Sequence, residues 1–205
     1  MHHDKPVNRR RFFREGLREL LKPLADAVQP FEEAMRQLEE LERFVPKEEP
    51  AGKWLRPPGA LNERAFVDTC SRCGKCASVC PAQCIKIDST GKEGNGAPYI
   101  VPEAMACVVC DGLVCMRDCP SGALVPTALG LLDMGTAVWD PHTCVRSTGE
   151  NCTICIDKCP IGSVAIELKE DRVHVIEDGC IGCGVCEHDC PTNPKSIVVI
   201  PKSAR

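Results

Sequence analysis

The sequence predicts an α+β fold in which two similar modules pack together after a helical N-terminal arm. Three observations lead to this prediction. Of the 17 cysteines among 205 residues, all but one fall into four blocks that each end in Cys-Pro. Short apolar segments typical of strands follow the blocks, and residues 1–60 contain no cysteine. A unit that recurs along a chain in this way indicates a repeated structural element.

Residues 1–60 are the first predicted domain, the helical arm. Apolar side chains recur at spacings of three and four residues from Phe13 to Val45, which is typical of helices. Pro23 and Pro30 interrupt the pattern, so two or three short helices are expected. Residues 1–22 carry seven Lys or Arg against three Asp or Glu, and a basic amphipathic segment can lie on a membrane surface. The stretch 52–62 is interpreted as a linker to the second domain, residues 61–205.

The arm contains the run Arg9-Arg10-Arg11-Phe12-Phe13-Arg14, which is similar to the twin-arginine export motif. Export also requires a continuous apolar segment after the arginines. Charged residues interrupt that segment here: Glu15, Arg18, Glu19, Lys22 and Asp26. We therefore expect a cytoplasmic protein that can associate with the membrane through its arm. A periplasmic location is the alternative if the motif is functional.

The spacing of the cysteines indicates iron–sulfur ligation. The first and fourth blocks have the pattern Cys-x2-Cys-x2-Cys-x3-Cys-Pro of bacterial ferredoxins, in which three cysteines hold one [4Fe–4S] cluster and the fourth reaches the neighbouring cluster. The second block has a gap of x4 before its third cysteine, and the third has a gap of x7 after its first. Four blocks predict four [4Fe–4S] clusters. The expected cofactor-binding, iron-ligating residues are Cys70, Cys73, Cys76, Cys80, Cys107, Cys110, Cys115, Cys119, Cys144, Cys152, Cys155, Cys159, Cys180, Cys183, Cys186 and Cys190.

Two other interpretations of the cysteines are weaker. Zinc is commonly held by pairs of Cys-x2-Cys motifs, but a third cysteine at the same spacing and a final Cys-Pro are not part of that pattern. A disulfide framework suits small secreted chains, and the odd number of cysteines argues against it. The remaining cysteine, Cys84, is interpreted as a buried thiol that behaves as a small apolar residue. The alternative for Cys84 is a spare cluster ligand.

The sequence leaves open which blocks exchange their fourth cysteines. Neighbouring blocks can pair, one with two and three with four, or the pairs can be nested, one with four and two with three. The like spacing of blocks one and four favours the nested scheme. Strands are expected at residues 85–87 and 99–101 after block one, at 164–168 and 173–176 after block three, and at 197–200 after block four.

The net charge of the cysteine-containing region indicates which kinds of macromolecule it can bind. Residues 61–205 carry thirteen Lys or Arg and eighteen Asp or Glu. This acidic balance argues against nucleic acid as a partner and favours redox proteins with basic docking surfaces. The sequence contains neither a glycine-rich phosphate loop after a strand nor a nucleophile with an evident base. We therefore expect an electron carrier without catalytic residues, and not an enzyme.

The irregular third block carries a family resemblance. The run Cys144-Val-Arg-Ser-Thr-Gly-Glu-Asn-Cys152-Thr-Ile-Cys155-Ile-Asp-Lys-Cys159-Pro resembles the third motif of NapG/MauM-type ferredoxins, and Cys-Glu-His in block four resembles their fourth. These are four-cluster proteins of nitrate reductase and methylamine-utilisation systems, and the resemblance covers about residues 65–201. It implies electron relay between a membrane quinol-oxidising iron–sulfur partner and a terminal oxidoreductase. The alternatives are a four-cluster subunit of a molybdoenzyme or hydrogenase complex and, of another class, a non-redox metal-binding scaffold.

Two departures from that family stand out in this chain. The apolar export segment that follows the arginines in members of the nitrate-reductase type is interrupted here, and Cys84 stands where an ordinary apolar residue is expected. Both departures concern the compartment and the partner, and neither changes the expected cluster ligands.

Overall fold

The computed structural model describes residues 54–204, so the expected helical arm and the arginine motif lie outside the described residues. This part of the chain is α+β, with five short α-helices and six short strands in residues 54–204. The helices are α2 (Glu63–Thr69), α3 (Lys75–Ser78), α4 (Val114–Arg117), α5 (Ile154–Asp157) and α6 (Val185–His188). The strands are β1 (Ile85–Lys86), β2 (Tyr99–Ile100), β3 (Gly135–Trp139), β4 (Ile166–Lys169), β5 (Arg172–Val175) and β6 (Ile197–Pro201). Within the same residues, no helix has the length and apolar character needed to span a bilayer.

Helices α3 to α6 repeat one local structure. Each is four residues long and carries the third cysteine of its block. Three of the four begin after a residue in the left-handed conformation: Gly74, Leu113 and Gly184. The left-handed residue turns the chain sharply into a single helical turn, and the fourth cysteine follows shortly after that turn ends.

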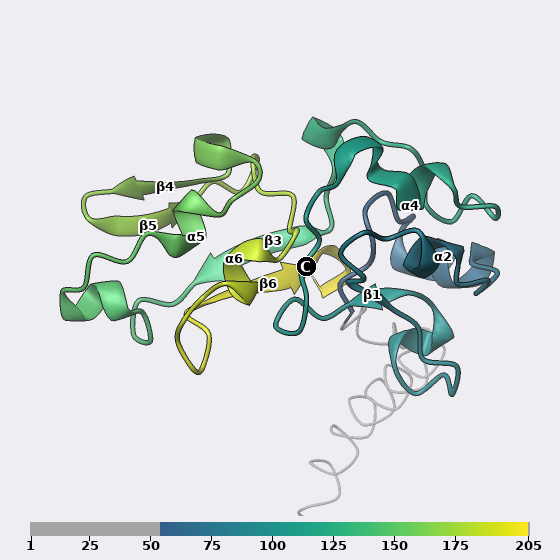
Figure 1. The fold of residues 1–205 in the computed structure, drawn as a ribbon, viewed down its shortest axis with the longest axis horizontal. Coiled ribbons are helices and arrows are strands. Elements are labelled where there is room, and N and C mark those ends of the chain that lie inside the picture. Colours follow the sequence, from purple (N-terminus) through teal and green to yellow (C-terminus); the bar gives the residue numbers. More distant parts are fainter. Residues whose placement is uncertain (1–53, 205) are drawn as a thin grey trace, which may run out of the picture. The chain divides into compact units, whose positions relative to one another are not determined.

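The strands form three antiparallel pairs within the described residues (Figure 1). The expected hairpins are present as β1–β2 and β4–β5, and the expected last strand is β6. Strand β3 was not predicted, and it pairs with β6 over its whole length, with Ala137 opposite Val199. Figure 1 shows β3 and β6 in the middle, with the β4–β5 hairpin on one side and β1, α2 and α4 on the other. The end of the chain is therefore held against the segment between blocks two and three.

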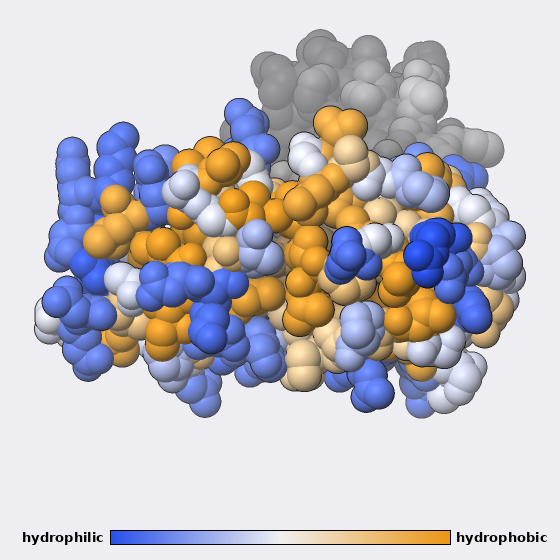
Figure 2. Space-filling view, turned by 45° about the horizontal axis from the view of Figure 1, so that its top comes forward, coloured by the Kyte–Doolittle hydropathy of each residue, from blue (hydrophilic) through white to orange (hydrophobic). Residues whose placement is uncertain are grey.

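The hydrophobic core is thin and is shared with cysteines. Phe66 and Ile197 are fully buried side chains of this core. Six cysteines are also buried: Cys76, Cys84, Cys107, Cys115, Cys183 and Cys190. Figure 2 shows hydrophobic side chains gathered across the middle of one face, with more hydrophilic side chains toward the ends. Cysteine side chains therefore make up a large part of the interior.

The interpretation of residues 52–62 as a linker is wrong for its described part. Leu55, Arg56, Pro57 and Pro58 are all buried. The amide of Ile100 donates to the carbonyl of Leu55 at 2.8 Å, so this segment pairs with the β1–β2 hairpin. Proline and glycine here shape a packed turn, and composition alone does not separate a packed turn from a free linker. The boundary between the two predicted domains stays a prediction.

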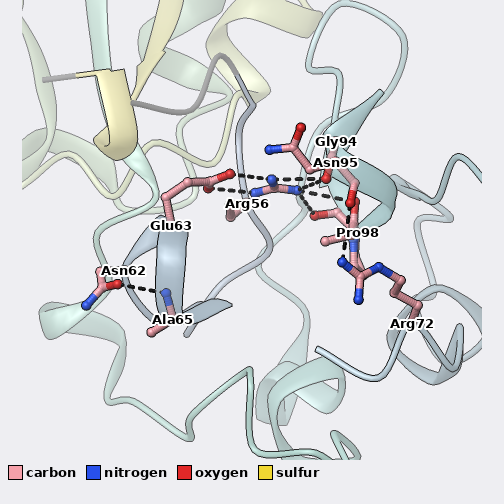
Figure 3. A network of polar contacts seen from close by, with 9 residues as sticks. Arg56, Asn62, Glu63, Ala65, Arg72, Gly94, Asn95 and Pro98 are labelled. Atoms are coloured by element: carbon pink, nitrogen blue, oxygen red, sulfur yellow. Dashed lines mark hydrogen bonds and ion pairs between the residues drawn. The ribbon is translucent and has the colours of Figure 1, made fainter. Parts of the chain in front are cut away.

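One buried arginine holds this segment in place (Figure 3). The Arg56 guanidinium, whose side chain is 6% exposed, forms a two-point ion pair with Glu63 on α2. It also donates to the backbone carbonyls of Gly94 (3.1 Å), Ala97 (3.2 Å) and Pro98 (2.9 Å). Its carbon lies 5.1 Å from the centre of the Phe66 ring. A buried charge is tolerated where its hydrogen bonds are satisfied in this way.

We predict that Arg56→Met strongly destabilises the protein. The substitution removes the donor of the Glu63 carboxylate and of the Ala97 and Pro98 carbonyls, a loss of about 3–5 kcal/mol for a buried pair. The measurement is the apparent Tm of the iron-loaded protein at a fixed scan rate without oxygen. Arg117→Met is the matched control, because the Arg117 side chain is 68% exposed in its pair with Asp118 and such pairs contribute about 0–1 kcal/mol. Equal shifts in both variants would contradict the role of Arg56.

Candidate iron–sulfur cluster sites

The structure gathers the sixteen block cysteines around four small hollows. Site A is bordered by Cys70, Cys73, Cys76 and Cys119. Site B is bordered by Cys80, Cys107, Cys110 and Cys115. Site C is bordered by Cys159, Cys180, Cys183 and Cys186. Site D is bordered by Cys144, Cys152, Cys155 and Cys190.

Each site takes three cysteines from one block and the fourth from the neighbouring block. Cys119 of block two borders site A, and Cys80 of block one borders site B. The same exchange relates Cys159 and Cys190. Helix α3 accordingly packs against α4, and α5 packs against α6. The nested scheme favoured by the spacing is therefore wrong, and adjacent blocks pair.

The irregular spacings that suggested nesting are local insertions. In block two, the extra residues form a 3-10 turn over Asp111–Leu113, in which Gly112 has a φ of 73°. In block three, Val145–Thr148 form another 3-10 turn between the first and second cysteines. Both turns bring the chain back to its site. Spacing therefore reports the local path of the backbone and not which blocks are partners.

The four sites follow one another in the order A, B, C, D. Burial is the main cause that raises the pKa of Cys115 in site B to about 12, and the nearby charge of Cys76 in site A is a smaller contribution to the same shift. Between sites B and C, the amide of Cys107 donates to the carbonyl of Cys183 at 3.0 Å. Burial also raises the pKa of Cys186 in site C, and the charge of Cys155 in site D adds to this effect. Each site therefore lies within electrostatic reach of the next.

The chemistry of the hollows fits a positively charged metal cluster. No Lys or Arg is among the described residues that line the four sites. Burial and the charges of neighbouring thiolates raise the pKa of Cys155 to about 11 and that of Cys183 to about 12. Four thiolates in an apolar hollow thus need a cationic occupant. Within residues 54–204, no three Cys, His, Asp or Glu groups converge on a point suited to a single ion.

Backbone amides point at several of these sulfurs. The amides of Arg72, Leu124 and Ala137 lie 3.4–3.5 Å from the sulfurs of Cys70, Cys119 and Cys180, respectively. Arg72 takes a φ of 57°, an uncommon value for a residue with a side chain. Amide donors of this kind stabilise thiolate charge and influence the redox potential of a bound cluster.

The structure also places Cys84 at site B. Cys84 is buried, as expected, and its sulfur lies 3.6 Å from the sulfur of Cys80. A hydrogen bond to Cys107, together with burial, raises the pKa of Cys84, and the same bond lowers the pKa of Cys107. Cys84 is therefore more than a small apolar residue, because its sulfur contacts that of Cys80, one of the four cysteines that border site B.

Arg146 is a buried residue beside site D that sequence analysis did not single out. Its buried guanidinium donates to the carbonyl of Cys152 at 3.2 Å and to the carbonyl of Asp171 at 3.0 Å, and it pairs with the Asp171 carboxylate. These bonds tie the long x7 loop of block three to the turn between β4 and β5. No motif marks such a residue, although its place inside the enlarged gap is a weak signal.

We predict that Arg146→Met loosens site D alone. The carbonyl of Cys152 loses its donor, so the loop that carries Cys144 is held less firmly. On addition of a chelator, we expect a fast phase of iron loss that accounts for about a quarter of the iron, as one of four like clusters. Lys169→Met is the control, because Lys169 is exposed. Uniform loss of iron, or none above the control, would contradict the assignment.

Comparison with known proteins supports the same chemistry. A family model described as a 4Fe-4S dicluster domain matches residues 69–123, which span blocks one and two. The chain is 39% identical over 165 residues to the methylamine utilization ferredoxin-type protein MauM of Methylobacillus flagellatus, covering 75% of this chain and 70% of the relative. It is 36% identical over 170 residues to the ferredoxin-type protein NapG of Escherichia coli, covering 75% and 73%. The chain therefore belongs to the family of MauM and NapG ferredoxin-type iron–sulfur proteins.

Proposed function

We propose that this chain is an electron carrier, and not an enzyme, that holds four [4Fe–4S] clusters through its sixteen block cysteines. The observation that carries the proposal is the division of these cysteines into four hollows of four. We further infer two packed two-cluster modules, one with sites A and B and the other with sites C and D. The match of a dicluster family model to blocks one and two supports this division.

A bound [4Fe–4S] cluster takes up and releases one electron with little change in geometry. The residues of this chain supply rigid positions for it. Each third cysteine lies on a one-turn helix, and each fourth cysteine arrives from the partner block. Apolar side chains such as Phe66 at site A and Ile166 at site C line the hollows and exclude water. The order A, B, C, D divides the path into short hops, and Cys73 in site A is the exposed member of the sixteen.

We propose that the electron partners are redox proteins: a membrane quinol-oxidising iron–sulfur protein as donor and a terminal oxidoreductase as acceptor. The support is family membership, because relatives are named for methylamine utilization, and the acidic charge of residues 61–205. The alternative is an electron-transfer subunit of a molybdoenzyme or hydrogenase. Isolation in a stable stoichiometric complex with a larger catalytic chain would favour this alternative.

We propose a cytoplasmic location with peripheral membrane association through the arm, because charged residues interrupt the apolar segment after the arginines. Cell fractionation compares the chain with an Arg9→Lys, Arg10→Lys variant. Recovery from the periplasm that depends on these arginines would instead assign export.

The cluster content is tested by purification without oxygen. We expect about sixteen iron and sixteen sulfide per chain and, after reduction, interacting S = 1/2 signals in EPR spectra. Zinc in place of iron would overturn the proposal. Iron that cannot be reduced would indicate the non-redox scaffold.

The pairing of blocks is tested by double substitution. Cys73 and Cys119 border the same site, so the double variant Cys73→Ala, Cys119→Ala should lose one cluster, as each single variant does. Cys110 and Cys119 border different sites, so the double variant Cys110→Ala, Cys119→Ala should lose two clusters. The reciprocal set, Cys80→Ala with Cys110→Ala, should again lose one. Loss of two clusters in both matched pairs would contradict the exchange between adjacent blocks.

A further inference from the structure

A small buried residue follows the fourth cysteine in every block and directly precedes a buried Ile or Leu. These four residues are Cys84, Ala123, Ala165 and Ser196, with exposures of 1%, 0%, 2% and 2%. Three of the four lie immediately before a strand, namely β1, β4 and β6. Cys84 and Ala123 lie four residues after their cysteine, and Ala165 and Ser196 lie six residues after theirs. A difference in the chemistry of these side chains distinguishes one site from another.

The side chains at these positions differ in their ability to donate hydrogen bonds. The Cys84 thiol lies 3.6 Å from the sulfur of Cys80, in site B. The Ser196 hydroxyl lies 3.7 Å from the sulfur of Cys190, in site D. Ala123 and Ala165 have no donor group in the side chain. Two of the four repeats therefore place a donor against the fourth cysteine from this position.

The side chain two residues after the fourth cysteine can also place a hydrogen-bond donor beside that cysteine. The Thr192 hydroxyl lies 3.2 Å from the sulfur of Cys190, and it lies 2.6 Å from the Ser196 hydroxyl. The two hydroxyls form a connected pair beside one sulfur, and connected hydrogen bonds strengthen one another. At site A, the Ser121 hydroxyl lies 3.7 Å from the sulfur of Cys119.

Site C differs from the other three in this respect. The residues at the two positions after Cys159 are Ile161 and Ala165, and neither side chain carries a donor. Both border the hollow of site C. The last cysteine of a block thus lies beside one hydroxyl at site A, one thiol at site B and two hydroxyls at site D. At site C, neither of these two positions places a side-chain donor beside it.

We propose that Cys84, Ser121, Thr192 and Ser196 are positioning residues that raise the reduction potentials of their own sites and leave site C without this effect. The inference rests on the proposed function, since it requires clusters at the four sites. A donor to a ligand sulfur stabilises negative charge, and reduction adds negative charge to the cluster. The side chains after each Cys-Pro therefore give chemically like clusters different potentials along the order A, B, C, D.

Cys84 acts as a donor in this scheme and not as a fifth ligand. Site B already has four cysteines around its hollow, and the Cys84 sulfur lies 3.6 Å from that of Cys80, one of the four. Cysteine binds metal as the thiolate, so the Cys80 sulfur carries negative charge when it holds iron. The S–H group of Cys84 is placed to donate a hydrogen bond to that sulfur.

The test is an EPR-monitored redox titration of the full-length, iron-loaded protein and its variants. In Cys84→Ala, one of the four midpoint potentials should fall by about 59 mV, which is a tenfold change in a one-electron equilibrium. In Thr192→Val with Ser196→Ala, a different one should fall. Cys84→Ser retains a donor and should restore most of the first shift. Ile161→Thr adds a donor at site C and should raise a third potential.

Thr148→Val is the matched control, because the Thr148 hydroxyl donates to the carbonyl of Val145 and not to sulfur. Iron and sulfide are counted in each sample. These counts separate the inference about hydrogen-bond donors from the proposed function as an electron carrier. Counts of about sixteen with unchanged potentials in Cys84→Ala and in the Thr192/Ser196 variant would overturn the inference and leave the electron carrier intact. Loss of one cluster in Cys84→Ala would make Cys84 a ligand and also overturn it. Absence of iron from the unsubstituted protein would overturn the proposed function itself.

Discussion

The structure depends on the exchange of fourth cysteines between adjacent blocks. Cys80 and Cys119 cross between sites A and B, and Cys159 and Cys190 cross between sites C and D. No site is complete within one block. The clusters proposed at these sites would tie distant segments together and add to the stability that the thin apolar core supplies.

Two buried arginines hold the segments next to the cysteine blocks in place. Arg56 fixes the segment before block one against α2 and the loop at residues 94–98. Arg146 fixes the enlarged loop of block three against the β4–β5 turn. Each satisfies backbone carbonyls that regular structure leaves free in a chain with such short helices and strands. A planar, always charged group with five donors is suited to this task.

Local features of the fold could be predicted from the sequence. The hairpins β1–β2 and β4–β5 were predictable because apolar and β-branched runs beside turn residues are local signals. Strand β3 was not, because its stability comes from pairing with β6, far along the chain. The pairing of blocks was missed because cysteine spacing reflects loop length, whereas the packing of α3 on α4 decides which sulfurs meet. Arg56 and Arg146 follow no motif, and only their burial reveals them.

The junction between sites B and C has a consequence for how this protein can diverge. The amide of Cys107 meets the carbonyl of Cys183, so the contact uses main-chain atoms alone. Replacement of surrounding side chains leaves such a contact in place, so the outer surface can change while sites B and C stay joined. The exceptions are the two glycines beside Cys183. A methyl group at Gly182 would lie 2.5 Å from the backbone of Gly135, and one at Gly184 would lie 2.7 Å from the Pro102 side chain. At this junction, most side chains can therefore be replaced, whereas a glycine hydrogen cannot be replaced by a larger group.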